Sequence, residues 1–176
     1  MEGNKSSSWL SIQKGEYVKE EESLYPDIES WLNDYLTDRY KKYDVKTTYE
    51  SSRQTLDVVL RKHGIEKKEA FGLAIKVDII GILKKDDDVK LVFVEVKDVP
   101  LTLVDLGQLW GYTQLLEPLE SFLVSSKGLG ALQNLFEIHK RTDLLFYGQK
   151  HEKFMKVAKW DKVRKSIDYS TLQPKI

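Results

Sequence analysis

The sequence predicts an α/β fold in which a central mixed β-sheet is flanked by helices. Segments with apolar residues at helical spacing alternate along the chain with short apolar segments of strand character. No internal repeat or long linker interrupts them, so we expect residues 1–176 to form a single domain. The core is expected over about residues 23–125, followed by an extension of a helix and strands over 131–168.

The first element expected is a helix that begins between Ser23 and Pro26 and ends near Tyr40. Pro26 suits the first turn of a helix, where its missing N–H leaves no hydrogen bond unmade. One apolar stripe follows the i, i+3, i+4, i+7, i+8 pattern, at Ile28, Trp31, Leu32, Tyr35 and Leu36.

Three strands are expected next, as a meander. The β-branched segment 55–61 predicts the first strand, and residues 62–64 resemble a turn. The apolar segments 73–83 and 90–97 predict the other two strands. The polar stretch 84–88 between them predicts a hairpin loop, so we expect these two strands to pair antiparallel.

A second helix is expected after the meander, with Thr102 or Asp105 as its cap and Pro118 marking its end. Apolar residues recur through it at helical spacing, which predicts one buried face. The later elements expected are a strand over 122–125, a loop over 127–130, a helix over 131–140, and strands over 144–147 and 154–160.

Composition limits the classes of site that the chain can contain. Hydrophobic residues make up 41% and charged residues 32%, which is typical of a globular protein. The absence of cysteine excludes a disulfide framework, a cysteine-ligated zinc site and an iron–sulfur cluster. The three histidines show no metal-ligand spacing, so we expect a metal to be held by oxygen atoms, which favours Mg²⁺ or Mn²⁺. No apolar run is long enough for a membrane span and residues 1–8 lack the character of a signal peptide, so we expect a cytoplasmic protein with no membrane partner.

The charges balance overall but not locally. The chain has 28 basic and 28 acidic side chains, so the net charge does not itself indicate a nucleic-acid partner. Residues 140–176 nevertheless contain ten Lys or Arg against four Asp or Glu. This excess is interpreted either as solvated faces or as a surface that meets phosphates. The basic residues in question are Lys153, Lys156, Lys159, Lys162, Arg164 and Lys165.

Two acidic residues interrupt apolar strand segments, and they are the strongest candidates for a functional site. An ionised carboxylate in an apolar strand is costly unless a cation or hydrogen bonds compensate it, and Asp78 and Glu95 both occupy such positions. Strand side chains alternate between faces, so Glu95 and Lys97 point the same way. If the strands pair as a hairpin, Asp78 converges with them. A divalent cation held there would polarise a phosphate and lower the pKa of a bound water.

These residues resemble the motif of the PD-(D/E)XK nuclease superfamily, which has the restriction-endonuclease-like fold. The match consists of Val77-Asp78 followed by Glu95-Val96-Lys97 on the next strand, with Val77 where the family's nominal proline stands. Gln108 and Tyr112, four residues apart on the following helix, resemble the Gln-x-x-x-Tyr element of the RecB-like and lambda-exonuclease-like branch. The predicted order of helix, three strands, helix and strand is also that of the family core.

The resemblance implies a Mg²⁺- or Mn²⁺-dependent deoxyribonuclease, either an endonuclease or an exonuclease. Asp78, Glu95 and the Val96 carbonyl are expected to bind the metal, and Lys97 to position or activate water. Gln108 and Tyr112 are expected to orient the metal shell or the phosphate. The family often adds a glutamate from the first helix, for which Glu29 is slightly favoured over Glu22. DNA is the expected partner, a homodimer is possible, and the absence of cysteine excludes the iron–sulfur cluster of some relatives.

Other interpretations of the same residues stay open. Asp78 and Glu95 would also be compatible with a solvated sheet face on which Lys97 pairs across strands. The alternatives are a catalytically inactive nuclease-fold subunit that binds DNA or serves in assembly, against which the three intact core residues count, and a hydrolase acting on RNA or another phosphate substrate. Asp57 is interpreted as an exposed or capping residue, and the acidic run 86–88 as a hairpin tip.

Overall fold

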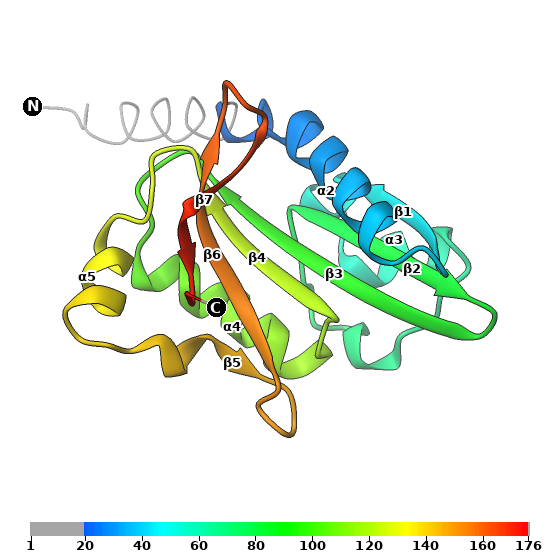
Figure 1. The fold of residues 1–176 in the computed structure, drawn as a ribbon. Coiled ribbons are helices and arrows are strands. Elements are labelled where there is room, and N and C mark those ends of the chain that lie inside the picture. The colour runs from blue at the N-terminus through cyan, green and yellow to red at the C-terminus, as the bar shows by residue number, and fades with distance from the viewer. Residues whose placement is uncertain (1–19, 176) are drawn as a thin grey trace, which may run out of the picture.

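The computed structural model describes residues 20–175, which form a seven-stranded mixed sheet with helices on both faces (Figure 1). The strands are β1 (Asp44–Thr48), β2 (Ile79–Lys85), β3 (Asp88–Lys97), β4 (Glu120–Ser125), β5 (Phe146–Tyr147), β6 (Lys153–Asp161) and β7 (Ser166–Gln173). The helices are α2 (Tyr25–Arg39), α3 (Leu56–Lys62), α4 (Leu103–Leu116) and α5 (Ala131–Glu137), with short 3₁₀ turns at Glu50–Ser52, Lys68–Ala70 and Thr142–Leu145. The α/β class and the mixed sheet flanked by helices are confirmed.

The strand order is β1-β2-β3-β4-β6-β5, and β7 also pairs with β6. Strands β1, β2 and β3 form an antiparallel meander, as expected, although its first strand is not the predicted one. Strands β3, β4 and β6 are parallel, so their carboxyl ends meet at one edge of the sheet. Helix α4 connects β3 to β4, because a parallel pair needs a long crossover.

Each face of the sheet has its own hydrophobic core. Helix α2 covers one face, where Ile28, Leu32 and Leu36 are fully buried against strand residues that include Val92 and Val94. Helices α3, α4 and α5 cover the other face (Figure 1). Within residues 20–175 no helix combines the length and the apolar character that a membrane crossing requires, and residues 1–8 lie outside the described chain.

Gly81 in β2 allows α2 to lie close to the sheet. A Cβ atom at this position would come within 2.5 Å of Leu36 Cδ1 and 3.3 Å of Val92 Cβ. The approach fixes the height of α2 over the sheet, and both ends of this helix contribute to the buried charge clusters described below.

The strand predicted over 55–61 is wrong, because this segment is helix α3. Leu56, Val59 and Leu60 are fully buried at the i, i+3, i+4 spacing of one helical face. Asp57 lies on the outer side and pairs with Arg61 one turn later. The apolar helical spacing outweighed the β-branched composition that suggested a strand.

Other boundaries also differ from the prediction. Strand β2 begins at Ile79, so residues 73–78 are not strand and Asp78 immediately precedes the strand. Helix α5 ends at Glu137, and of the predicted strand 144–147 the first two residues belong to a 3₁₀ turn and the last two form strand β5. Strands β1 and β7 were not predicted; both include exposed or half-buried positions and lack a continuous apolar pattern. The helix at α2, the hairpin of β2 and β3, and the α4 helix are confirmed.

Candidate active site around Asp78, Glu95 and Lys97

The candidate residues meet where β2 and β3 separate. The antiparallel pairing of these strands ends at Ile79 and Val94, so Asp78 and the last three residues of β3 lie beyond the ladder. Phe93 belongs to the core under α4, whereas Val94 and Val96 belong to the core under α2. Glu95 and Lys97 therefore face the α4 side of the sheet, as the alternation of strand residues predicts.

Asp78 is held by two hydrogen bonds. Its Oδ2 accepts the Val96 backbone N–H at 2.8 Å, and its Oδ1 accepts the Tyr25 hydroxyl at 2.9 Å. The side chain is only 14% exposed. The N–H and C=O of one strand residue point to the same side, so the Val96 carbonyl also faces the opening next to Asp78.

Glu95 is buried, with one oxygen bound and the other free. Lys97 Nζ and Gln108 Nε2 both donate to Glu95 Oε1 at 2.8 Å. Oε2 is also buried and has no hydrogen-bond partner among residues 20–175. A buried carboxylate oxygen without a partner loses its hydration without compensation, so it is suited to receive a cation or a proton.

The Lys97 ammonium lies among three carboxylates. Its Nζ is 2.8 Å from Glu95 Oε1, 3.9 Å from Glu21 Oε1 and 4.0 Å from Asp78 Oδ2. One positive charge thus faces three acidic groups. This cluster of side chains has an excess of negative charge, so it can bind a further cation.

Burial and mutual repulsion shift the acids of this group together. Burial raises the pKa of Glu95 to about 8, the charge of Asp78 adds to the shift, and Lys97 opposes it. Burial raises the pKa of Glu21 to about 7 against the lowering effect of Lys97. Burial likewise raises the pKa of Asp78. Burial alone would lower the pKa of Lys97, but Glu95 and Asp78 together raise it above its ordinary value.

Helix α4 supplies Gln108 and Tyr112 to the same group. Thr102 and Asp105, both candidates for the cap, share a capping box in which Asp105 Oδ2 accepts the Thr102 N–H and hydroxyl at 2.8 Å. This anchors the helix start, and Gln108 then reaches Glu95. Tyr112 lies one turn further on, half-buried, and its pKa is raised by burial and by the charge of Glu95.

The glutamates near the start of the first helix have partners other than those expected. Glu29 accepts a hydrogen bond from Thr47 of β1 at 3.2 Å, and Glu22 pairs with Arg53 at 2.9 Å. Glu21 is the acid whose carboxylate approaches Lys97. Sequence reasoning passed over Glu21 and its partner Tyr25, whose hydroxyl is 3.4 Å from Glu21 Oε1. Residues 23–24 form a turn between Glu21 and Tyr25, so no helical spacing in the sequence signalled that both reach the site.

The donor set fits a hard divalent cation. The carboxylates of Asp78 and Glu95 and the Val96 carbonyl offer oxygen atoms, the ligand type that Mg²⁺ and Mn²⁺ prefer. The free Glu95 Oε2 is the observation that tests the fit, since nothing in the described chain compensates its burial. Within residues 20–175, no three acidic or histidine side chains are arranged to hold a metal ion. The positive charge beside Glu95 is that of the Lys97 ammonium.

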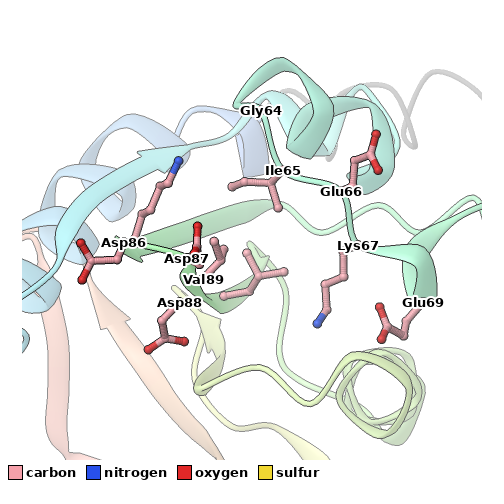
Figure 2. A pocket seen from close by; sticks show the side chains of 11 residues that line it. Gly64, Ile65, Glu66, Lys67, Glu69, Asp86, Asp87, Asp88 and Val89 are labelled. Atoms are coloured by element: carbon pink, nitrogen blue, oxygen red, sulfur yellow. The ribbon is translucent and has the colours of Figure 1, made fainter.

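A second concentration of acids lies at the opposite end of β3. A cavity of about 520 Å³ is lined there by the β2–β3 turn, confirmed as a hairpin tip, and by the segment 64–69. Figure 2 shows the carboxylates of Asp86, Asp87, Asp88, Glu66 and Glu69 pointing in different directions and not toward one centre. Asp88 is engaged by the Tyr43 hydroxyl at 2.7 Å. This end of the sheet therefore lacks the convergence seen around Glu95.

Comparison of the chain with known protein families, with curated proteins and with solved structures finds no match.

Proposed function

We propose that this protein is a metal-dependent nuclease that hydrolyses DNA phosphodiester bonds, with a core related to the restriction-endonuclease-like fold of the PD-(D/E)XK superfamily. The observation that carries the proposal is the arrangement of Asp78, Glu95 and Lys97 where β2 and β3 separate, with a buried and unpartnered oxygen on Glu95. The antiparallel meander followed by α4 and the parallel strand β4 agrees with the element order of that family.

Asp78, Glu95 and the Val96 carbonyl would hold Mg²⁺ or Mn²⁺. Such an ion, when bound, polarises a phosphate and makes water a stronger nucleophile at neutral pH. Glu21 takes the place that the resemblance gives to a first-helix glutamate, because it approaches Lys97 whereas Glu29 and Glu22 are bound elsewhere.

Lys97 acts as a charged hydrogen-bond donor. Its raised pKa keeps the ammonium protonated at neutral pH, so it does not serve as the general base. A protonated lysine beside the reacting phosphate orients water and stabilises the negative charge that develops in the transition state. Gln108 holds Glu95 Oε1 from α4 and so positions this carboxylate.

The first test compares wild-type protein with Lys97→Ala on supercoiled plasmid, linear duplex, single-stranded DNA and RNA, each with Mg²⁺, Mn²⁺ or EDTA. We expect DNA cleavage that requires metal and falls by about 10²-fold or more in the variant, because a transition-state donor is lost. Lys85→Ala, an exposed lysine at the far end of the same hairpin, is the matched control and should cleave as wild type does.

Cleavage that persists in EDTA, or that Lys97→Ala leaves unchanged, would refute the proposed site. Folded protein that cleaves no substrate under any of these conditions would leave the non-catalytic nuclease-fold subunit as the better description. Preference for RNA over DNA would change the substrate class, since contacts to the 2′-hydroxyl distinguish the two.

A further inference from the structure

A basic pocket lies beside the candidate active site, at the same edge of the sheet. Lys97, Ser125 and Lys159 are register partners on the adjacent parallel strands β3, β4 and β6. Neighbouring strands are about 4.8 Å apart, so the Cα atoms of Lys97 and Lys159 are separated by about 10 Å. Ala158 and Trp160 belong to the core under α2, so Lys159 projects to the opposite face, which is the face of Glu95 and Lys97.

The pocket has a volume of about 320 Å³ and an excess of positive charge. Lys127, Lys159 and Lys175 line it, against a single acidic residue, Glu137, whose carboxylate accepts hydrogen bonds from Gln133. The side-chain amides of Gln133 and Gln173 also line it and can donate hydrogen bonds to an anion, whereas the hydroxyls of Ser170 and Thr171 already donate to Asp168.

The lysines of the pocket are less engaged than the other basic residues of the C-terminal region. Five of the six basic residues noted between 153 and 165 bind acids or a carbonyl, namely Lys153, Lys156, Lys162, Arg164 and Lys165. Within residues 20–175, Lys159 and Lys127 form no ion pair or side-chain hydrogen bond. Asp168, the register partner of Lys159 on β7, has its carboxylate bound to the N–H and hydroxyl of Ser170. Lys175 donates to the Ser170 carbonyl and pairs with no acid of the described residues 20–175.

Hydrogen bonds fix the pocket relative to Lys97. The segment 98–101, which continues from Lys97, crosses to the loop 126–130 of the pocket. Ser125 Oγ donates to the Val99 carbonyl at 2.6 Å and accepts the Lys127 N–H at 3.0 Å. Leu101 exchanges backbone bonds with this loop and the start of α5. Gly130, at φ +52°, packs so tightly that a Cβ would lie 2.5 Å from the Leu101 carbonyl oxygen. These contacts hold the pocket in a fixed position relative to strand β3.

We propose that this pocket binds a backbone phosphate of the nucleic acid strand being cut, close to the scissile phosphate. The inference rests on the proposed nuclease function. The separation of about 10 Å between the Cα atoms of Lys97 and Lys159 keeps the two phosphates within a short stretch of one strand. Two unpaired lysines recognise a phosphate without reading sequence, so the pocket sets the position of the strand and not its base preference.

The test measures binding of a fluorescent duplex oligonucleotide, over a range of salt concentrations, in a Lys97→Ala background with Mg²⁺. The test variant adds Lys127→Glu and Lys159→Glu, both at exposed positions. The matched control adds Lys42→Glu and Lys85→Glu, which make the same change in net charge at exposed sites outside the pocket. We expect the pocket variant to bind roughly tenfold more weakly at about 0.1 M salt. Its slope of log K against log salt should be shallower by about 0.9, because one phosphate contact is lost.

Equal weakening in the pocket and control variants would overturn the pocket as a phosphate site, while wild-type cleavage would still stand on its own assay. Binding that depends on the pocket in a protein that cleaves nothing would support the pocket and refute the nuclease. Absence of binding to any nucleic acid by the Lys97→Ala protein would overturn the inference, and binding of an acidic peptide in place of DNA would do the same.

Discussion

The sheet carries two buried clusters of glutamate, lysine and tyrosine, and they are built for different purposes. The first is the candidate active site, which Tyr25 at the start of α2 contacts. The second surrounds Glu120 of β4 at the other end of the same helix. Glu120 accepts hydrogen bonds from the hydroxyls of Tyr35 and Tyr40 and from Lys156 Nζ. Arg39 Nε lies 3.3 Å from Glu120 Oε1.

The clusters differ in how completely the central carboxylate is compensated. Both oxygens of Glu120 have donors, and Lys156 also lies 4.9 Å from the centre of the Phe122 ring. Burial alone would raise the pKa of Glu120, but Lys156 and the hydroxyl donors lower it below its ordinary value. Glu95 has donors on one oxygen only and has Asp78 and Glu21 as like-charged neighbours, so its pKa rises to about 8. We infer that the Glu120 cluster stabilises the fold, whereas the Glu95 cluster sacrifices stability for the capacity to bind a cation.

Matched Glu→Gln substitutions test this comparison, and the largest expected effect is on cleavage by Glu95→Gln. The substitution keeps an oxygen acceptor for Lys97 and Gln108 but removes the negative charge that would hold the metal. We expect cleavage to fall by about 10²- to 10³-fold. The free energy of unfolding in EDTA at neutral pH should change by less than about 1 kcal/mol, because burial already disfavours the charged form of this glutamate and one of its oxygen atoms has no partner among residues 20–175.

Plasmid cleavage and denaturant unfolding on the same preparation measure both quantities. Loss of several kcal/mol of stability in Glu95→Gln would contradict the comparison, because it would show that Glu95 contributes to the fold in the way proposed for Glu120. Retained cleavage would remove Glu95 from the metal site.

The second expected effect is on stability, in Glu120→Gln. The substitution leaves the Lys156 ammonium without its counter-charge, although its side chain is only 14% exposed. Breaking one partner of a buried ion pair is strongly destabilising, and we expect a loss of about 3 kcal/mol in the free energy of unfolding. Any fall in cleavage should disappear under conditions where the variant is fully folded. Chemical denaturation at pH 7 provides the measurement.

Glu66→Gln is the control for this substitution, since Glu66 is exposed and unpaired within the described residues. Its free energy of unfolding should stay within about 0.5 kcal/mol of wild type. If the Glu120→Gln protein is as stable as this control, the cost of burying the charges of Glu120 and Lys156 equals the energy gained from their attraction, and the Glu120 cluster does not stabilise the fold.

The residues of the candidate site were predictable because their signal is local to strands. An acid in an apolar strand and the alternation of faces are enough to place Glu95 beside Lys97, and the helical spacing of α4 adds Gln108. The position of Asp78 was also anticipated, although the strand that should contain it begins one residue later. The restriction-endonuclease-like assignment stays a prediction.

Residues that depend on tertiary placement were not predictable. Glu21 and Tyr25 reach the site only because α2 starts above the point where β2 and β3 separate, which no local pattern encodes. The basic excess of residues 140–176 was visible, but ion pairing could not be assigned from sequence. Lys156 and Lys162 turn to the buried acids Glu120 and Asp98, which leaves Lys159 for the pocket. Segment 55–61 shows the related limit, because burial of one helical face decided between helix and strand.

The smallest expected effect is on the pH dependence of stability, for which the two clusters predict opposite signs in metal-free protein. The folded-state pKa values of Glu95 and Glu21, about 8 and about 7, exceed the ordinary value. Their favourable contribution is complete below about pH 4.5 and is lost as the pH rises through the folded values. Glu120 has a lowered pKa, so its contribution is present above about pH 4.5 and is lost as the pH falls through the folded value.

The free energy of unfolding in EDTA, measured from about pH 2 to about pH 9, should therefore decline toward alkaline pH through Glu95 and toward acid pH through Glu120. Glu95→Gln should flatten the alkaline decline and leave the acid limb in place, and Glu120→Gln should do the reverse. The difference curves against wild type isolate each group from the other titrating carboxylates. An alkaline limb that Glu95→Gln leaves unchanged would mean that the Glu95 carboxylate is compensated in the folded protein. The candidate site would then have lost the uncompensated charge that distinguishes it from the Glu120 cluster.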